Sequence, residues 1–100
     1  MATSNAFTVF QGSTIVLRWA FYDTSKRFVE ATGLICSVYS NQQIKLCENP
    51  VVRQDTGMYT SAIDTSALGL VAGEYIVELI GVANGLGIAQ RDYLIVKFLT

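Results

Sequence analysis

The amino-acid sequence predicts an all-β protein, a β-sandwich of seven short strands. In most segments apolar side chains alternate with polar ones, which is the two-residue period of a strand that buries one face. Turn-forming residues separate the segments at spacings of roughly 8–14 residues, as in known sandwiches. No long stretch keeps the period of a helix. We place one domain over residues 6–100, a length that allows a substantial core.

The first two strands are expected over residues 6–10 and 14–22. Residues 1–5, which precede them, are small and polar, and we expect a flexible N-terminus there. In the second strand four large apolar side chains fall on one face, namely Ile15, Leu17, Trp19 and Phe21. Such a face belongs in the core, and an aromatic residue on it is expected to be a core anchor.

The next two strands, over 34–40 and 44–47, form a hairpin that contains both cysteines. A two- or four-residue loop would place Cys36 directly opposite Cys47, close enough to bond. A three-residue loop instead puts the thiols on opposite faces and gathers the apolar side chains on one face, namely Cys36, Val38, Ile44 and Leu46. Because apolar grouping favours the three-residue loop, we expect free thiols.

A polar turn at 54–57 leads to a strand over 58–64. Alternation places three of its side chains on the inner face, namely Tyr59, Ser61 and Ile63. The segment 65–72 is the one place where a helical turn is expected, with Thr65 or Ser66 as its cap and two leucines beneath the sandwich.

The last two strands, over 73–82 and 88–99, form the hairpin around which the fold is organised. Their inner faces are expected to contain Tyr75, Val77 and Leu79 on one strand and Leu94, Val96 and Phe98 on the other. The carboxylates on the outer face of the first of these strands, Glu74 and Glu78, are read as solubilising charges.

The register of this hairpin depends on the length of its loop. A four-residue loop, 84–87, pairs Glu74 with Lys97 and Ile76 with Ile95. A five-residue loop slips the register by one and sets two carboxylates opposite each other. We therefore expect the four-residue loop. It leaves an outward apolar stripe that the rest of a seven-strand sandwich does not cover, formed by Ile76, Ile80, Tyr93 and Ile95. We expect this stripe to be a subunit contact.

Composition narrows the possible partners. Seven Lys and Arg stand against eight Asp and Glu, so there is no basic excess for binding nucleic acid. Charged residues make up 15% of the chain and hydrophobic residues 51%, more apolar side chain than a small domain can bury. We therefore expect a homo-oligomer or a place in a larger assembly. With no signal peptide and no apolar run long enough for a membrane span, synthesis in the cytoplasm and no membrane partner are expected.

The residue types needed for common active sites are missing or scattered. The sequence has no histidine, so it has neither a Ser-His-Asp nor a Cys-His arrangement, and two cysteines alone make no zinc site. Its carboxylates lack the spacing of a glycosidase pair or a calcium loop. We therefore expect a protein that is not an enzyme and has no cofactor or metal. Three aromatic residues are candidates for a sugar-binding platform, namely Tyr22, Tyr39 and Tyr93.

Two segments resemble known families. Residues 57–66, GMYTSAIDTS, are followed by the pattern L-x-A-G-x-Y-x-V at residues 70–77, and together they resemble bacterial and phage immunoglobulin-like domains. Residues 10–19, FQGSTIVLRW, resemble the first strands of small sandwich modules in virion proteins of tailed bacteriophages. The resemblance implies an immunoglobulin-like β-sandwich and a place in the virion.

Three functions follow from these observations. The first is a non-catalytic structural protein of a tailed-phage virion, a capsid decoration, neck or tail component that contacts itself or other virion proteins. A solitary domain starting at Met1, the apolar surplus and the absence of catalytic motifs favour it. The second is a carbohydrate-binding or adhesion module, which requires exposed aromatic residues. The third, an enzyme or its accessory domain, is disfavoured by the missing histidine.

Overall fold

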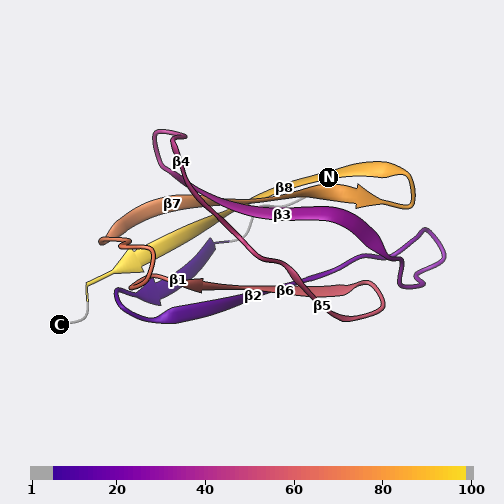
Figure 1. Cartoon of the computed structure of the whole chain (residues 1–100), viewed down its shortest axis with the longest axis horizontal. Helices are drawn as coiled ribbons and strands as arrows, with labels where there is room; N and C mark the ends of the chain where they lie inside the picture. Colours follow the sequence, from indigo (N-terminus) through magenta and orange to yellow (C-terminus); the bar gives the residue numbers. More distant parts are fainter. Residues whose placement is uncertain (1–5, 99–100) are drawn as a thin grey trace.

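Eight β-strands in two sheets make up the protein in a computed structural model that describes residues 6–98 (Figure 1). In this part of the chain no helix is long and apolar enough to cross a membrane. The strands are β1 (Ala6–Phe10), β2 (Thr14–Ala20), β3 (Ala31–Ser40), β4 (Lys45–Asn49), β5 (Val52–Asp55), β6 (Met58–Asp64), β7 (Gly73–Ala83) and β8 (Leu86–Lys97). The expected flexible N-terminus, residues 1–5, lies outside the described residues, as do residues 99–100.

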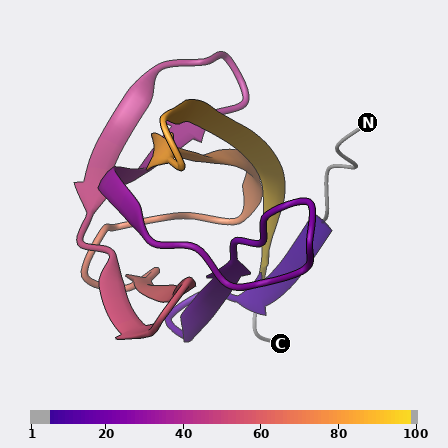
Figure 2. The ribbon, with the colours of Figure 1, turned by 90° about the vertical axis from the view of Figure 1, so that its right-hand side faces the viewer.

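The larger sheet has the strand order β1-β8-β7-β3-β4 and the smaller one the order β2-β6-β5. The pairing of β1 with β8 is parallel, and the other pairings within the sheets are antiparallel. The chain changes sheets between β4 and β5, and Figure 2 shows this crossing at one side of the sandwich. This arrangement is an immunoglobulin-like β-sandwich, as the sequence predicted.

The eighth strand is β5, which the sequence did not predict; its second half falls in the turn expected at 54–57. Each residue of β5 is exposed, so it shows none of the apolar alternation by which the other strands were recognised. Its pairing with β6 places Val52 opposite Thr60 and Arg53 opposite Tyr59. The strand therefore forms because its backbone completes the edge of the smaller sheet.

The β7–β8 hairpin turns through a two-residue loop, Asn84–Gly85, with Ala83 opposite Leu86. Both loop residues have positive φ, 53° and 75°. Positive φ at both positions is what a type I′ turn requires, and this turn matches the twist of paired strands. The expected four-residue loop is therefore wrong.

The shorter loop moves the register by two residues. Glu74 lies opposite Ile95 instead of Lys97, and Ile76 lies opposite Tyr93. Since side chains alternate with a period of two, a shift of two leaves each of them on the face that was predicted.

A bulge at Leu46 shapes the β3–β4 hairpin. Val38 lies opposite Cys47, but the next residue of β3, Tyr39, lies opposite Lys45. The additional residue on β4 changes which of its side chains face the core.

Both cysteines consequently lie on the inner side of the larger sheet, Cys36 fully buried and Cys47 half-buried. The thiols are free, as predicted. Their predicted placement on opposite faces is wrong, because that prediction assumed an unbulged hairpin. Ile44 and Leu46, predicted to share the apolar face, are 59% and 45% exposed.

The core lies between the sheets and contains the side chains predicted for the inner faces of β2, β6 and β7. Trp19 and Tyr75 are 9% and 8% exposed, and both belong to the central cluster. The Tyr75 hydroxyl donates to the carbonyl of Val71 at 2.7 Å, a tyrosine corner of the kind found in immunoglobulin domains. Phe98, predicted to face inward, is 67% exposed, because β8 ends at Lys97.

The segment between β6 and β7 forms hydrogen-bonded turns and no helix. The first of these turns is capped by Asp64, whose carboxylate accepts from the N–H groups of Ser66 and Ala67. The predicted capping residue, Thr65 or Ser66, is therefore wrong. Thr65 is buried and instead donates its hydroxyl to the carbonyl of Ser13 at 2.7 Å. As predicted, the two leucines of this segment pack on the core.

Candidate functional site

The four residues predicted as an interface lie on the outer face of the larger sheet, which we define as the face turned away from the smaller sheet. Ile76 and Ile80 come from β7, and Tyr93 and Ile95 come from β8. Tyr93 is 53% exposed and Ile80 is 38% exposed, whereas Ile76 and Ile95 are half-buried. Their outward position follows from the alternation with the buried core residues of the same strands.

Strand pairing divides these four residues into two groups. Tyr93 lies directly opposite Ile76, and Ile95 is the next outward residue on β8. We call these three residues the β7–β8 patch. Ile80 lies two outward positions farther along β7, opposite Ala89.

An ion pair separates the two groups. Glu78 stands between Ile76 and Ile80 on β7, and Arg91 lies opposite it on β8, with its Nε 2.8 Å from Glu78 Oε2. The Tyr39 hydroxyl of β3 lies 3.3 Å from the same carboxylate, and the Arg91 guanidinium lies 5.7 Å from the centre of the Tyr39 ring. Glu78 is therefore held by two neighbours and is not merely a solubilising charge.

The predicted interface omitted three neighbours on the outer face: Tyr39 of β3, which was named instead as a candidate for sugar binding, Ile35 of β3 and Val82 of β7. Tyr39 lies opposite Ile76 on the side away from Tyr93, and Ile35 lies opposite Ile80. Ile35 and Val82 are 37% and 44% exposed. The missing information was the pairing of β3 with β7, which the sequence does not specify.

Charges on the outer face are sorted by strand. The outward positions of β7 include the carboxylates of Glu74 and Glu78, whereas those of β8 include the cations of Arg91 and Lys97. Glu74, Arg91 and Lys97 are exposed. The β7–β8 patch is therefore bordered by negative charge on one strand and by positive charge on the other.

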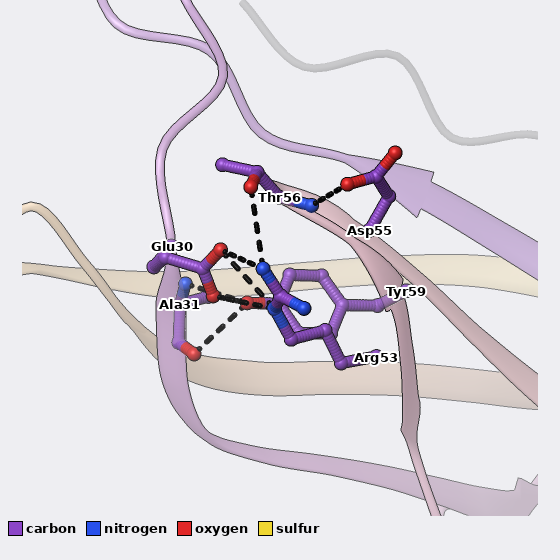
Figure 3. Close-up of polar contacts among 6 residues, drawn as sticks. All are labelled: Glu30, Ala31, Arg53, Asp55, Thr56 and Tyr59. Carbon is purple, nitrogen blue, oxygen red and sulfur yellow. Dashed lines mark hydrogen bonds and ion pairs between the residues drawn. The ribbon is translucent and has the colours of Figure 1, made fainter.

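A polar cluster at one end of the sandwich links Glu30, Arg53 and Tyr59 (Figure 3). Arg53 reaches both carboxylate oxygens of Glu30, with Nη2–Oε1 at 2.8 Å and Nε–Oε2 at 3.0 Å. The Tyr59 hydroxyl lies 3.0 Å from Glu30 Oε2 and accepts from the N–H of Ala31 at 2.9 Å.

These contacts hold the pKa of Glu30 at about 2, below its ordinary value of 4.5, chiefly through the hydrogen bond from Arg53. The three residues come from β5, β6 and the segment before β3, so the cluster ties these elements together. It contains no group placed to act as a base or nucleophile, and its chemistry is structural.

The outer face of the smaller sheet has a shallow hollow of about 340 Å³, lined by Val16, Arg18, Trp19, Gln54, Met58, Tyr59 and Thr60. A second hollow, of about 520 Å³, lies between β2 and the start of β8. The charged side chain lining each of them is Arg18. Neither hollow combines the groups needed for acid–base or nucleophilic catalysis.

Groups that could bind metal or act as nucleophiles are dispersed. Within residues 6–98, no three acidic or cysteine side chains come together as a metal site would need. Burial raises the pKa of the Cys36 thiol to about 11 and also raises that of Cys47, so both stay protonated near neutral pH.

Comparison with known proteins supports the fold assignment. No protein-family model matches the sequence, and no curated protein shows significant similarity to it. CopC from Methylosinus trichosporium OB3b is similar over 97% of this chain and 88% of its own, with a TM-score of 0.67 and 16% identity. The filamin domain of Lin-41 is similar over 85% of this chain and 81% of its own, with a TM-score of 0.57 and 11% identity.

A third similar structure is the endo-beta-1,4-mannanase from Thermotoga petrophila, with a TM-score of 0.62 and 20% identity. It matches 97% of this chain, which spans only 18% of the mannanase. At these identities the similarity shows the fold alone, an immunoglobulin-like β-sandwich that occurs both as a separate domain and as part of a larger enzyme.

Proposed function

We propose that this protein is a non-catalytic interaction module and that it acts through the outer face of its larger sheet. The observation that carries the proposal is the β7–β8 patch, three large apolar side chains on strands at the centre of that sheet. Charges border this patch, and Tyr93 within it is 53% exposed. An apolar centre with a charged rim is the usual composition of a protein interface.

The more specific form of the proposal is a structural role in the virion of a tailed bacteriophage, as a capsid decoration, neck or tail component. It rests on the resemblance of residues 10–19 and 57–77 to virion and phage immunoglobulin-like modules. The partners would be other copies of this chain or other virion proteins. In that setting subunit burial would cover the apolar surplus that the composition indicates.

A double substitution in the patch tests the contact surface. Tyr93→Thr with Ile95→Thr removes apolar area and places at both positions a β-branched residue that is suited to strands. We expect the variant to melt close to the parent and to lose the assembled species seen by light scattering. The matched control is Val16→Thr with Val52→Thr on the outer face of the smaller sheet, where the side chains are 47% and 53% exposed.

Comparison of the two double variants shows which sheet forms the contact surface. If the control loses assembly and the patch variant keeps it, the interface lies on the smaller sheet and the proposal fails. For the virion role, the decisive measurement is the presence of the protein in purified particles and the loss of the patch variant from them. A protein that never copurifies with particles contradicts the virion role and leaves the interaction module intact.

A second candidate function, carbohydrate binding, is favoured by one observation. Tyr39 and Tyr93 flank Ile76 from its two sides, so two aromatic residues lie on the same face of one sheet. Against it, Tyr39 is half-buried, its hydroxyl lies near Glu78 and its ring lies near Arg91. Since one similar structure is part of an endo-beta-1,4-mannanase, soluble β-1,4-mannan is a suitable probe. Saturable binding that Tyr93→Thr abolishes would support this function, and no binding would exclude mannan as its ligand.

A further inference from the structure

We propose that the occupant of the outer face is a second copy of this chain, related to the first by a twofold axis that runs parallel to the strands between β7 and β8. This inference rests on the proposed function, because it names the partner of the same patch. It is carried by the sorting of charge between the two strands.

The charges make the outer face complementary to itself. A copy turned by 180° about such an axis places its β8 over β7 of the first copy, and its β7 over β8. Arg91 of each β8 then lies over Glu78 of the other β7. Glu74 lies over Ile95 of the other copy, and the next outward residue on that β8 is the cation Lys97. An axis perpendicular to the strands would place β7 on β7 and β8 on β8, so that like charges meet. Electrostatics therefore selects the first arrangement.

The centre of the face fits the same arrangement. Because Tyr93 and Ile76 lie opposite each other within one copy, the axis places Tyr93 of each copy over Ile76 of the other. An aromatic residue against an aliphatic one at the middle of an interface is a typical source of binding energy. Next to this contact, Glu78 of each copy would lie over Arg91 of the other, so that opposite charges of the two ion pairs face each other.

Two single charge reversals test the arrangement. In Glu74→Lys, the new cation of each copy lies one outward position from Lys97 of the other. In Lys97→Glu, the new carboxylate of each copy lies one outward position from Glu74 of the other. Each variant alone is expected to dimerise about tenfold more weakly than the parent, since two symmetric contacts become repulsive. The control is Lys26→Glu, which makes the same change of charge as Lys97→Glu in the exposed loop between β2 and β3 and should dimerise like the parent.

Mixing the two variants provides the discriminating measurement. In a mixed dimer, the cation introduced by Glu74→Lys in one copy neighbours the carboxylate introduced by Lys97→Glu in the other, and the remaining pair of positions 74 and 97 is wild type. Native mass spectrometry should therefore find the mixed dimer well above the statistical fraction. A purely statistical mixture, or reversals that leave dimerisation unchanged, would overturn the twofold arrangement.

The patch variant separates the two proposals. If Tyr93→Thr with Ile95→Thr abolishes assembly and the reversals do not weaken it, the face is an interface but its occupant is not a second copy in this arrangement. If the patch variant assembles normally, the proposed function fails. Thermal melting of each reversal variant should match the parent, because both positions are exposed; a large drop would contradict the outward placement of that residue.

Discussion

The hydroxyl of Tyr75 donates to the carbonyl of Val71 at 2.7 Å, and this bond fixes the path of the chain into β7. The Tyr75 ring is buried in the core, so the side chain both packs and bonds. Tyr75→Phe should lower the free energy of unfolding by about 1 kcal/mol, the net value of a hydrogen bond. Tyr75→Ala should lower it by about 3–5 kcal/mol, because a cavity also forms. Urea unfolding of both variants checks the difference; equal losses would show that the hydroxyl contributes nothing.

The ion pair of Glu30 with Arg53 predicts a specific loss of stability in acid. The pKa of Glu30 is about 2 in the folded protein, against an ordinary value of 4.5. A lowered pKa means that the fold favours the charged carboxylate, so its contribution is complete above about pH 4.5 and is lost as the pH falls toward 2. Glu30→Gln should therefore be less stable than the parent at neutral pH and should lose less on acidification.

Thermal melts of the parent and of Glu30→Gln between pH 7 and pH 2 measure this difference. Glu48→Gln removes an exposed carboxylate from β4 and serves as the control. Parallel pH profiles for the parent and Glu30→Gln would contradict the assignment of the effect to the Arg53 contact.

The cysteines are predicted to react with iodoacetamide at different rates. Cys36 is fully buried and its pKa is raised to about 11, whereas Cys47 is half-buried. Only the thiolate is nucleophilic, so in the folded protein Cys47 should be alkylated first and Cys36 only on unfolding. Mass spectrometry without reductant should find both alkylated in denaturant, whereas a mass lower by two hydrogens would show a disulfide.

Two glycines of positive φ should differ in their tolerance of alanine. Gly57 has a φ of 68°, and a Cβ there would lie 3.0 Å from the carbonyl oxygens of Phe21 and Val29. Gly12 has a φ of 89°, but a Cβ there would meet nothing within 4 Å. Gly12→Ala should lower the free energy of unfolding by about 1–2 kcal/mol, from backbone strain alone. Gly57→Ala should lower the free energy of unfolding further, as measured by urea unfolding. Equal losses for the two variants would show that the loop around Gly57 can move to accommodate the added Cβ.

Much of the sandwich could be predicted from the sequence because its core strands alternate. The buried set on β2, β6 and β7 follows directly from that period, including Trp19 and Tyr75. The strand β5 could not be predicted, since all its side chains are exposed and its pairing alone makes it a strand. A fully exposed edge strand shows no alternation of apolar and polar residues in the sequence.

The register of the hairpins could be predicted only in part. At β7–β8 the four-residue loop, with Glu74 opposite Lys97, was preferred because a five-residue loop opposed two carboxylates, whereas the two-residue loop avoids that clash and places Glu78 opposite Arg91. At β3–β4 no glycine or proline in the sequence indicates the bulge at Leu46. Because of this bulge, Cys47 lies on the inner side of the sheet. Local charge pairing therefore does not specify register when more than one favourable pairing exists.

The candidate site could be predicted to the level of a face, because a shift of two residues preserves the faces. All four predicted residues lie on the outer face of the larger sheet. The ion pair that divides them, and the neighbouring Tyr39, depend on which strand lies beside β7. The pairing of β3 with β7 is a feature of the tertiary structure, and the sequence pattern of the individual strands does not specify it.

The most direct test of the interface is hydroxyl-radical footprinting of two tyrosines. Tyr93, in the β7–β8 patch, is 53% exposed, and Tyr22, on the loop after β2, is 55% exposed, so the two should be oxidised to similar extents in the isolated protein. In the assembled state, whether with other copies or on a partner protein, oxidation of Tyr93 should fall several-fold while that of Tyr22 stays unchanged. If Tyr93 remains as reactive as Tyr22 in the assembled protein, the outer face of the larger sheet is not the contact surface.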